Sequence, residues 1–137
     1  PITTGHRQWK DKGHCSFVHG YGRYVRLTFE ASELDERGWV MDFGDLKDVK
    51  KWIESEWDHR VLIAADDPLL SDLQELESKG GIYLNVLDDG YYPGIEESCR
   101  YLYDKLNPMI KEKTNNRVEI TRVEVWEHEN NHAEYVR

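Results

Sequence analysis

Cysteine is scarce in this sequence, and so are long apolar runs. Of the 137 residues only two are cysteine, Cys15 and Cys99, and they stand far apart in the chain. Two distant thiols do not make the disulfide scaffold of a small secreted domain, so we expect a reducing, cytoplasmic setting. No run is long enough to cross a bilayer, and the first residues lack a signal-like apolar segment. Cys99 falls on a predicted helix, where a cysteine is ordinarily a small core residue.

Basic residues are also few, because 18 lysines and arginines face 27 acidic residues and the net charge is -9. Nucleic acids and anionic membranes are themselves negative and need basic patches, so neither is an expected partner. A phosphorylated small molecule would need a local basic cluster. Arg7, Lys10, Lys12, Arg23 and Arg26 offer one near the candidate site, although exposed basic residues commonly face only solvent.

The length fits a single domain, residues 1–137, with one hydrophobic core. Alternating apolar residues predict strands, and apolar residues recurring every three or four positions predict helices. Strands are expected at 1–8, 18–31, 39–41, 82–87, 118–126 and 133–136, and helices at 45–57, 68–78 and from 95 to 105 or beyond. This order predicts an α+β fold in which helices cover one face of an antiparallel sheet.

Three details of this prediction depend on single residues or short segments. A polar turn at 33–38 makes the segments 18–31 and 39–41 a hairpin. Pro108 lies where the last helix is expected to be interrupted or to end. The alternation in the strand 118–126 has a small phase break near Arg122.

The stretch from Cys15 to Tyr21 is the most informative part of the chain, because it combines a thiol, an imidazole and a phenol. Side chains two apart on a strand share a face, so His19 and Tyr21 are expected to point the same way. A catalytic zinc has three protein ligands and an open position, and neutral imidazoles such as His6 and His19 suit it. A third imidazole is not obvious. Tyr21 is on the right face but tyrosine is a poor zinc ligand, and His14 is the alternative.

Proton-transfer groups are the second kind of candidate. Cys15 could act as a general base or acid if its thiolate forms, because only the thiolate accepts a proton. Asp58 directly precedes His59 where the helix 45–57 stops, and a carboxylate beside an imidazole can orient it for proton transfer. Composition alone would leave Asp58 as a solvated surface charge.

Taken together, these residues resemble the pterin-forming tunnelling-fold enzymes, 6-pyruvoyl-tetrahydropterin synthase and 6-carboxytetrahydropterin synthase. That family has an early strand-borne histidine, C-x-x-x-H-G-H, D-F-x-x-L-K, an Asp-His pair, a Pro-x-x-Glu helix start and a late glutamate. The similar positions, in family order, are His6, Cys15, His19-Gly20, Asp42 to Lys47, Asp58-His59, Pro93 to Glu96, and Glu127. The sequence departs from the pattern twice: Tyr21 stands for the third histidine, and Gly94 stands for a threonine.

The resemblance implies a fold, an assembly and a set of roles. Its members have the tunnelling fold and join sheets from several subunits into a barrel, usually as trimers stacked into hexamers. The metal ligands would be His6 and His19 with Tyr21 in the third position, holding zinc that polarises the substrate hydroxyls. Protons would be moved by Cys15, Asp58 and His59. Glu127 would accept the N–H groups of the pterin ring, and Glu96 matches the glutamate of the helix start.

We therefore expect a homo-oligomeric cytoplasmic lyase that acts on 7,8-dihydroneopterin triphosphate and releases triphosphate. The preferred activity is that of 6-carboxytetrahydropterin synthase, in the route to 7-deazaguanines such as the queuosine precursor. Two alternatives stay open: 6-pyruvoyl-tetrahydropterin synthase activity, and a non-catalytic pterin- or purine-binding protein that lost the third metal ligand. A purely structural domain is disfavoured, because it would have no use for the matching site residues.

Overall fold

A computed structural model describes all residues from 1 to 137. Its elements, in chain order, are β1 (Ile2–His6), η1 (His14–Ser16), β2 (His19–Ala31), η2 (Phe43–Leu46), α1 (Lys47–Trp57), β3 (Arg60–Ile63), α2 (Leu70–Ser78), β4 (Leu84–Val86), α3 (Ile95–Lys113), β5 (Val118–His128) and β6 (Asn131–Val136). The two η elements are short 3₁₀ turns. None of the helices has the length and apolar character that a membrane crossing needs.

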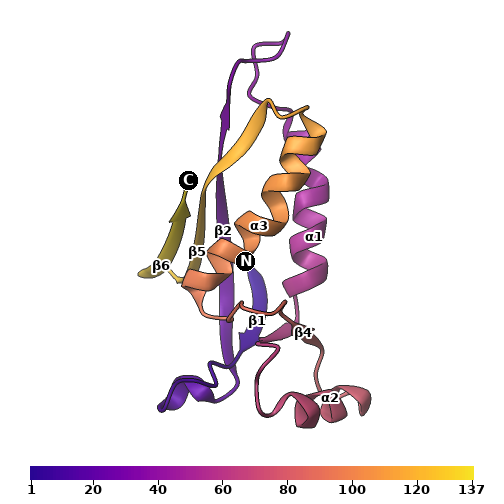
Figure 1. The fold of residues 1–137 in the computed structure, drawn as a ribbon, viewed down its shortest axis with the longest axis vertical. Helices are drawn as coiled ribbons and strands as arrows, with labels where there is room; N and C mark the ends of the chain where they lie inside the picture. Colours follow the sequence, from indigo (N-terminus) through magenta and orange to yellow (C-terminus); the bar gives the residue numbers. More distant parts are fainter.

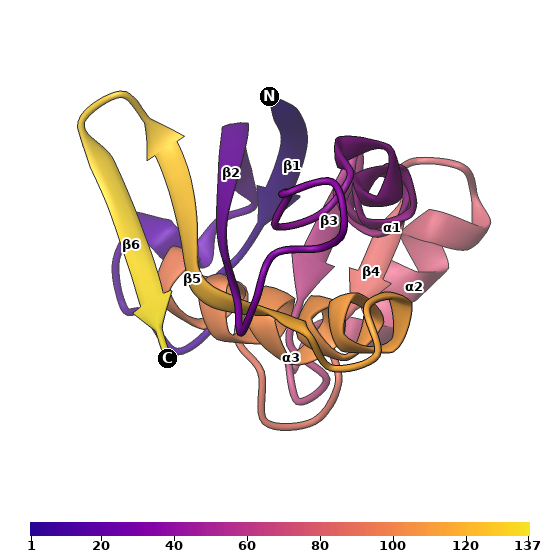
Figure 2. The same cartoon turned by 90° about the horizontal axis from the view of Figure 1, so that it is seen from above.

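The six strands form one sheet in the order β4-β3-β1-β2-β5-β6, which Figure 2 shows nearly end-on. The pairs β1-β2, β2-β5 and β5-β6 are antiparallel, as the sequence predicted. The other two strands extend the sheet differently, because β3 runs parallel to β1 and β4 runs parallel to β3. The sheet is therefore mixed, with an antiparallel main part and a short parallel margin.

The core lies between this sheet and two long helices, α1 and α3, which lie side by side in Figure 1. Their apolar residues recur at spacings of three and four, so each helix presents one apolar stripe to the sheet. The core includes Val49, Ile53 and Trp57 of α1, Leu102, Leu106 and Ile110 of α3, and Val118, Ile120, Val123 and Val125 of β5. The short helix α2 lies apart from them at the lower end of Figure 1.

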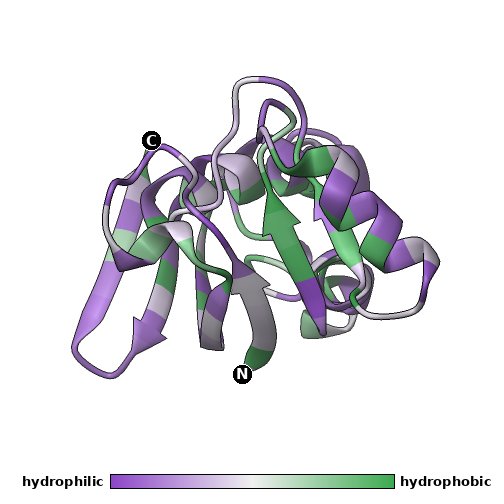
Figure 3. Cartoon of the chain, turned by 90° about the horizontal axis from the view of Figure 1, so that it is seen from below, coloured by the Kyte–Doolittle hydropathy of each residue, from purple (hydrophilic) through white to green (hydrophobic).

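The opposite face of the sheet is polar. Arg26 of β2 pairs with Glu124 of β5, and Glu124 pairs with Glu134 of β6, so these side chains share the face that α1 and α3 leave free. Figure 3 shows the C-terminal hairpin mostly in purple, whereas β3 is mostly green. One face of the sheet is thus built for the core and the other for a polar environment.

The predicted strand at 39–41 and its hairpin are wrong. The Asp35 carboxylate accepts hydrogen bonds from the backbone N–H groups of Arg37 and Trp39, both at 2.9 Å, and closes a turn around Gly38. Gly38 has a φ of 79°, which glycine adopts without steric cost. A side chain that takes over backbone donors competes with a strand ladder, so the segment forms a loop.

Two further differences and one confirmation concern the limits of elements. The strand β3 was missed, since its four residues follow directly on Asp58-His59 and were left within a connection. Pro108 neither interrupts nor ends α3, which continues to Lys113. The phase break near Arg122 is confirmed, because the β2-β5 register shifts between Thr28 and Phe29, opposite that part of β5.

Candidate active site

The site begins where β1 ends and β2 starts, at the lower end of the sheet in Figure 1. His6 and His19 are direct partners in the antiparallel register, and their ring centroids lie 4.5 Å apart. The strands approach closely here because Gly20 has no side chain. A Cβ at Gly20 would lie 2.0 Å from the carbonyl oxygen of Thr4, so only glycine allows this pairing.

Tyr21 completes a group of three rings. Its centroid lies 5.7 Å from that of His6 and 5.8 Å from that of His19. His6 is buried, at 4 % exposure, while His19 and Tyr21 are partly buried. The three residues that the sequence offered as metal ligands therefore do meet in space.

These rings line a cleft of about 690 Å³ that also takes in Cys15, Glu96 and Glu127. Its other lining residues are Gln8, Asp11, Gly94, Ile95, Asn130, Asn131 and His132. Cys15 comes from η1, Glu96 from the first turn of α3 and Glu127 from the end of β5. Five elements, β1, η1, β2, α3 and β5, thus meet at one end of the sheet, and six of the eight predicted site residues lie in one cleft.

Tyr21 and Glu127 face each other in this cleft. Burial, followed by the negative charge of Glu127, raises the pKa of the Tyr21 hydroxyl to about 12. The phenol is therefore protonated at neutral pH and offers an O–H donor. Glu127 adds a carboxylate acceptor beside it, so the end of β5 supplies the acceptor side of the cleft.

Behind His6 lies Arg23, a residue that the sequence analysis did not assign to the core of the site. It is fully buried, and its guanidinium donates hydrogen bonds to Ser98 Oγ and to the Pro93 carbonyl, both at 2.9 Å. A third N–H of Arg23 points at His6 Nδ1, at 3.3 Å. Burial, then the positive charge of Arg23, lowers the pKa of His6 to about 3, so this imidazole is neutral.

The strand alternation places Arg23 at an inward position, but because of its charge it was grouped with the exposed basic residues. Arg23 has the same strand parity as Tyr21 and Val25, which face the helices, whereas Tyr24 and Arg26 face outward. An arginine at an inward position of an amphipathic strand is unusual, because a buried charge is costly unless it finds several acceptors. Such a position is a reason to suspect a site.

His19 has a different environment from His6. Its Nδ1 lies 2.6 Å from the carbonyl oxygen of Phe17. A carbonyl only accepts hydrogen bonds, so Nδ1 carries the proton and Nε2 keeps its free electron pair.

Asp58 and His59 do not line the cleft of the same chain. They lie where β3 starts, and Asp58 Oδ1 accepts a hydrogen bond from the backbone N–H of Thr3 at 3.1 Å. Thr3 precedes His6 by three residues, which corresponds to roughly 10 Å along a strand. Asp58 and His59 contact each other, since Asp58 Oδ2 lies 2.9 Å from His59 Nδ1. The His59 side chain is 77 % exposed.

The predicted basic cluster does not form beside the cleft of one chain. Arg7 binds Asp67 through two hydrogen bonds, at 2.6 and 3.0 Å, and Lys10 donates to the Tyr92 hydroxyl at 2.6 Å. Arg23 is buried, as described above. The opposite face of the sheet holds Arg26. Of the five, only Lys12 has neither a side-chain hydrogen bond nor an ion pair, and it is exposed.

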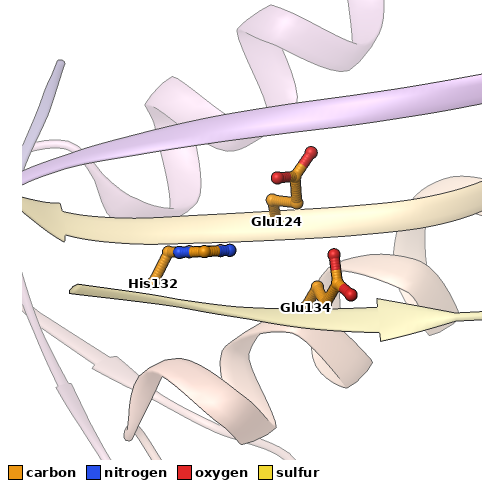
Figure 4. A group of neighbouring side chains, drawn as sticks. All are labelled: Glu124, His132 and Glu134. Carbon is orange, nitrogen blue, oxygen red and sulfur yellow. The ribbon is translucent and has the colours of Figure 1, made fainter. Parts of the chain in front are cut away.

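One group outside the cleft has the donor atoms of a metal site. Glu124, His132 and Glu134 bring ligand atoms within 4.8 Å of one another on the polar face, and Figure 4 shows the His132 ring pointing toward the two carboxylates. Each carboxylate already has a counter-ion, since Arg26 lies 3.8 Å from Glu124 and Arg122 lies 3.6 Å from Glu134. A group that could hold a metal ion therefore exists, but its charges are already balanced by arginines.

Comparison with known proteins adds independent findings. The family model described as 6-pyruvoyl tetrahydropterin synthase matches residues 2–137. A 6-carboxy-5,6,7,8-tetrahydropterin synthase of Aquifex aeolicus is 26% identical over 148 residues, covering 96% of this chain and 91% of its own length. The enzyme of that name from Rickettsia felis is 30% identical over 108 residues, 78% of this chain and 75% of its own.

Solved structures have the same fold. An uncharacterised Wolinella succinogenes protein superposes with a TM-score of 0.81 at 23% identity, covering 99% of this chain and 93% of its own. The 6-pyruvoyl tetrahydropterin synthase of Plasmodium vivax superposes with a TM-score of 0.71 at 18% identity, covering 99% and 90%. The predicted α+β tunnelling fold is confirmed, with the parallel strands β3 and β4 added to its antiparallel sheet.

Proposed function

Because the chain belongs to the 6-pyruvoyl tetrahydropterin synthase family, a family of pterin synthase lyases, we propose that it converts 7,8-dihydroneopterin triphosphate with release of triphosphate. Between the two family activities we propose that of 6-carboxytetrahydropterin synthase, in the synthesis of 7-deazaguanines such as the queuosine precursor. The names of the sequence relatives support this choice. The proposed setting is the cytoplasm, with a small-molecule substrate and no nucleic-acid or membrane partner.

One observation carries the proposal. Cys15, Tyr21, Glu96 and Glu127 come from four parts of the chain and line the same cleft as the two histidines. A packed core alone does not require a thiol, a phenol and two carboxylates to face one solvent-accessible space. Polar groups that converge in a concave site are the usual mark of substrate binding.

Each group has a role in this proposal. Glu127 accepts the paired N–H groups of the pterin ring, a task that suits the two oxygens of a carboxylate. Glu96, in the first turn of α3, is the second carboxylate available to the substrate. Cys15 accepts and returns the proton of the substrate side chain, since it is the only thiol in the cleft. Tyr21 donates a hydrogen bond from its protonated hydroxyl.

Zinc is the cofactor that the resemblance implies, and the donor atoms of the cleft do not fit it. His19 offers a free Nε2, but Nδ1 of His6 faces an arginine donor. The third position holds the phenol of Tyr21, which is not among the histidine, cysteine and carboxylate ligands that zinc sites ordinarily use. The chemistry proposed here therefore uses side chains alone, and no step passes through a metal.

Asp58 and His59 take part only if a second copy of the chain brings them to the cleft. We propose a homo-oligomer, a trimer or hexamer, for this reason. The pair is exposed yet already hydrogen-bonded, so it is preorganised to act on something outside its own chain. No lysine or arginine lines the cleft of one chain, so in this proposal the cations for the triphosphate also come from a second copy.

The free edge of β2 supports the same assembly. β1 pairs only with residues 19–23 of β2, so residues 24–31 have no partner on that side. A groove of about 530 Å³ runs there, lined mainly by apolar residues of β2 and α1, among them Val25, Leu27, Val49 and Ile53. Unpaired strand edges are normally covered, and a second copy of the sheet is a natural cover.

Incubation of the purified protein with 7,8-dihydroneopterin triphosphate tests the function. Mass spectrometry is expected to find 6-carboxytetrahydropterin and free triphosphate, with a large loss of both in Cys15→Ala. Cys99→Ala is the matched control, because Cys99 lies on α3, is buried against the sheet and is not part of the cleft lining. A 6-pyruvoyl product would select the second family activity.

A specific departure favours the other candidate function, a non-catalytic pterin- or purine-binding protein. Tyr21 replaces the third histidine of the family pattern, and the donor set does not fit zinc. If the family chemistry requires that metal, the cleft would bind a pterin and leave it unchanged. Binding of the substrate without either product, by calorimetry and mass spectrometry on the same protein, would establish this alternative and overturn the enzymatic proposal.

A further inference from the structure

We infer that Arg23 fixes His6 as the tautomer that carries its proton on Nε2, so that the His6–His19–Tyr21 group is a hydrogen-bonding centre for a hydroxylated ligand and not a zinc site. Only the identity of the ligand, the hydroxylated side chain of a pterin, rests on the proposed function. The tautomer and the metal preference are properties of this chain alone.

Arg23 cannot move away from His6 without losing other contacts. Its side chain is fully buried, and two hydrogen bonds, to Ser98 Oγ and to the Pro93 carbonyl, hold the guanidinium from the side of α3. The guanidinium carbon also lies 5.5 Å from the ring of Trp57, which is itself fully buried. Three parts of the core thus fix the donor that faces His6 Nδ1.

The direction of this contact decides the tautomer. An arginine N–H can only donate, so the Nδ1 atom of His6 must accept and carries no proton. A neutral imidazole has one proton, which then lies on Nε2. His19 has the opposite arrangement, because its Nδ1 donates to the Phe17 carbonyl. Two imidazoles whose centroids are 4.5 Å apart are therefore held in opposite tautomers.

Only one of the two tautomers suits a metal. A histidine that ligates through Nε2 keeps its proton on Nδ1 and donates it to an oxygen, as His19 does. In His6, a proton on Nδ1 would point at an N–H group of Arg23 inside the core. Neither of these two N–H groups would then have an acceptor. The Nδ1 atom is no alternative ligand, because Arg23 occupies its direction. Loss of the hydrogen-bond partner that orients a ligating histidine typically weakens metal binding 10–100-fold.

The same arrangement favours hydroxyl groups. His6 presents an Nε2–H donor, Tyr21 an O–H donor and His19 an Nε2 acceptor, all on one wall of the cleft. A hydroxyl donates one hydrogen bond and accepts up to two, so neighbouring hydroxyls on a short chain match an alternation of donors and an acceptor. Arg23 acts through His6, which makes it a positioning residue for this wall.

Nitrogen NMR of the wild-type protein measures the tautomers directly. Long-range ¹H–¹⁵N spectra distinguish a protonated from a bare ring nitrogen, and His6→Asn assigns the His6 signals. The inference expects proton on Nε2 for His6 and on Nδ1 for His19. A proton on Nδ1 of His6 would overturn it, and this readout needs neither a substituted Arg23 nor any turnover.

Cobalt titration tests the metal preference. All proteins carry His132→Ala, so that the Glu124–His132–Glu134 group does not contribute, and the visible absorption of tetrahedral Co²⁺ reports binding. Tyr21→His completes three histidines but keeps Arg23, so we expect weak binding. Tyr21→His with Arg23→Met removes the opposing donor, and Co²⁺ is expected to bind on the order of 100-fold more tightly.

Two results would contradict the inference. Tyr21→His alone could bind Co²⁺ as tightly as the double variant, which would mean that Arg23 does not oppose ligation. Alternatively, the protein with native His6, Tyr21 and Arg23 could hold one equivalent of metal that His6→Ala removes. Neither result depends on catalysis, so a failure here and a failure of the proposed function are separate outcomes.

Discussion

The cleft residues and the Asp58–His59 pair both follow the order of the family pattern in sequence, but they differ in how the chain builds them. The cleft is gathered by strand register, which sets His6 opposite His19, and by the ends of α3 and β5. The pair lies further back along β1, at Thr3, and contacts none of these groups. A match in sequence order therefore does not mean that residues meet within one chain.

Their environments differ as well. The cleft has buried donors and acceptors held by the core, whereas His59 is exposed and has a φ of 59°, a left-handed value that is uncommon for a residue other than glycine. A left-handed φ at a residue other than glycine is kept where the surrounding structure holds it, and such residues cluster at functional sites. In the proposed function, the cleft of one chain binds the pterin and a second copy supplies Asp58 and His59.

The largest expected effect is on turnover in His59→Ala. If the pair completes the cleft of another copy, kcat falls by roughly 10²–10⁴-fold, the usual contribution of a general acid or base. The thermal midpoint should stay unchanged, because the side chain is exposed. The control is His128→Ala, an exposed histidine of β5 outside the cleft lining. Steady-state kinetics that show equal kcat for both variants would remove Asp58 and His59 from the mechanism.

The next effect is on binding in Glu127→Gln. The amide keeps the size of the carboxylate but offers one acceptor and one donor in place of two acceptors, so a pterin N–H is left unmatched. A lost charged hydrogen bond of about 1.5–3 kcal/mol corresponds to roughly 10–100-fold weaker binding. Calorimetry with a pterin measures it, with Glu129→Gln in the β5–β6 turn as the control. Unchanged affinity in Glu127→Gln would mean that the ring binds elsewhere.

The last effect concerns His6 and the pH dependence of the free energy of unfolding. The pKa of His6 is about 3 in the folded protein, against an ordinary value of 6.5. Below pH 6.5 the unfolded chain takes up a proton that the folded chain refuses, so acidification favours unfolding by about 1.4 kcal/mol per pH unit at this site. The window runs from pH 6.5 down to about 3.

Urea unfolding at several pH values isolates this contribution. His6→Asn keeps an acceptor for Arg23 and has no ionisation near pH 6.5, so its stability should fall less steeply than that of the wild type between pH 6 and 4. Other groups titrate equally in both proteins and cancel in the difference. Parallel curves would show that His6 is not held neutral by its surroundings.

Much of the fold followed from short-range rules, whereas the set of cleft residues was expected from the family resemblance. Alternation predicted the antiparallel strands, and side chains two apart on a strand predicted that His19 and Tyr21 share a face. These two features depend on a few neighbouring residues, which is why the sequence alone could predict them. The register that brings His6 alongside, with Gly20 opposite β1, was seen only in the structure.

What the sequence did not predict depends on distant partners. Arg7 lies among the basic residues of the N-terminal part, but it binds Asp67, and nothing near either residue indicates that pair. Arg23 was counted with the surface charges, because its partners, Ser98 and the Pro93 carbonyl, lie on the far side of the core. The loop at 39–41 formed instead of a strand because Asp35 took its backbone donors.

Complementation between two inactive variants tests the central claim most directly, namely that one chain supplies the cleft and another supplies Asp58 and His59. Cys15→Ala and His59→Ala are co-expressed in equal amounts, and turnover of 7,8-dihydroneopterin triphosphate is measured on the mixed assemblies. Random assembly makes one cleft in four intact, so activity should return to about a quarter of the wild-type value. Activity that stays at the level of the separate variants would contradict the account.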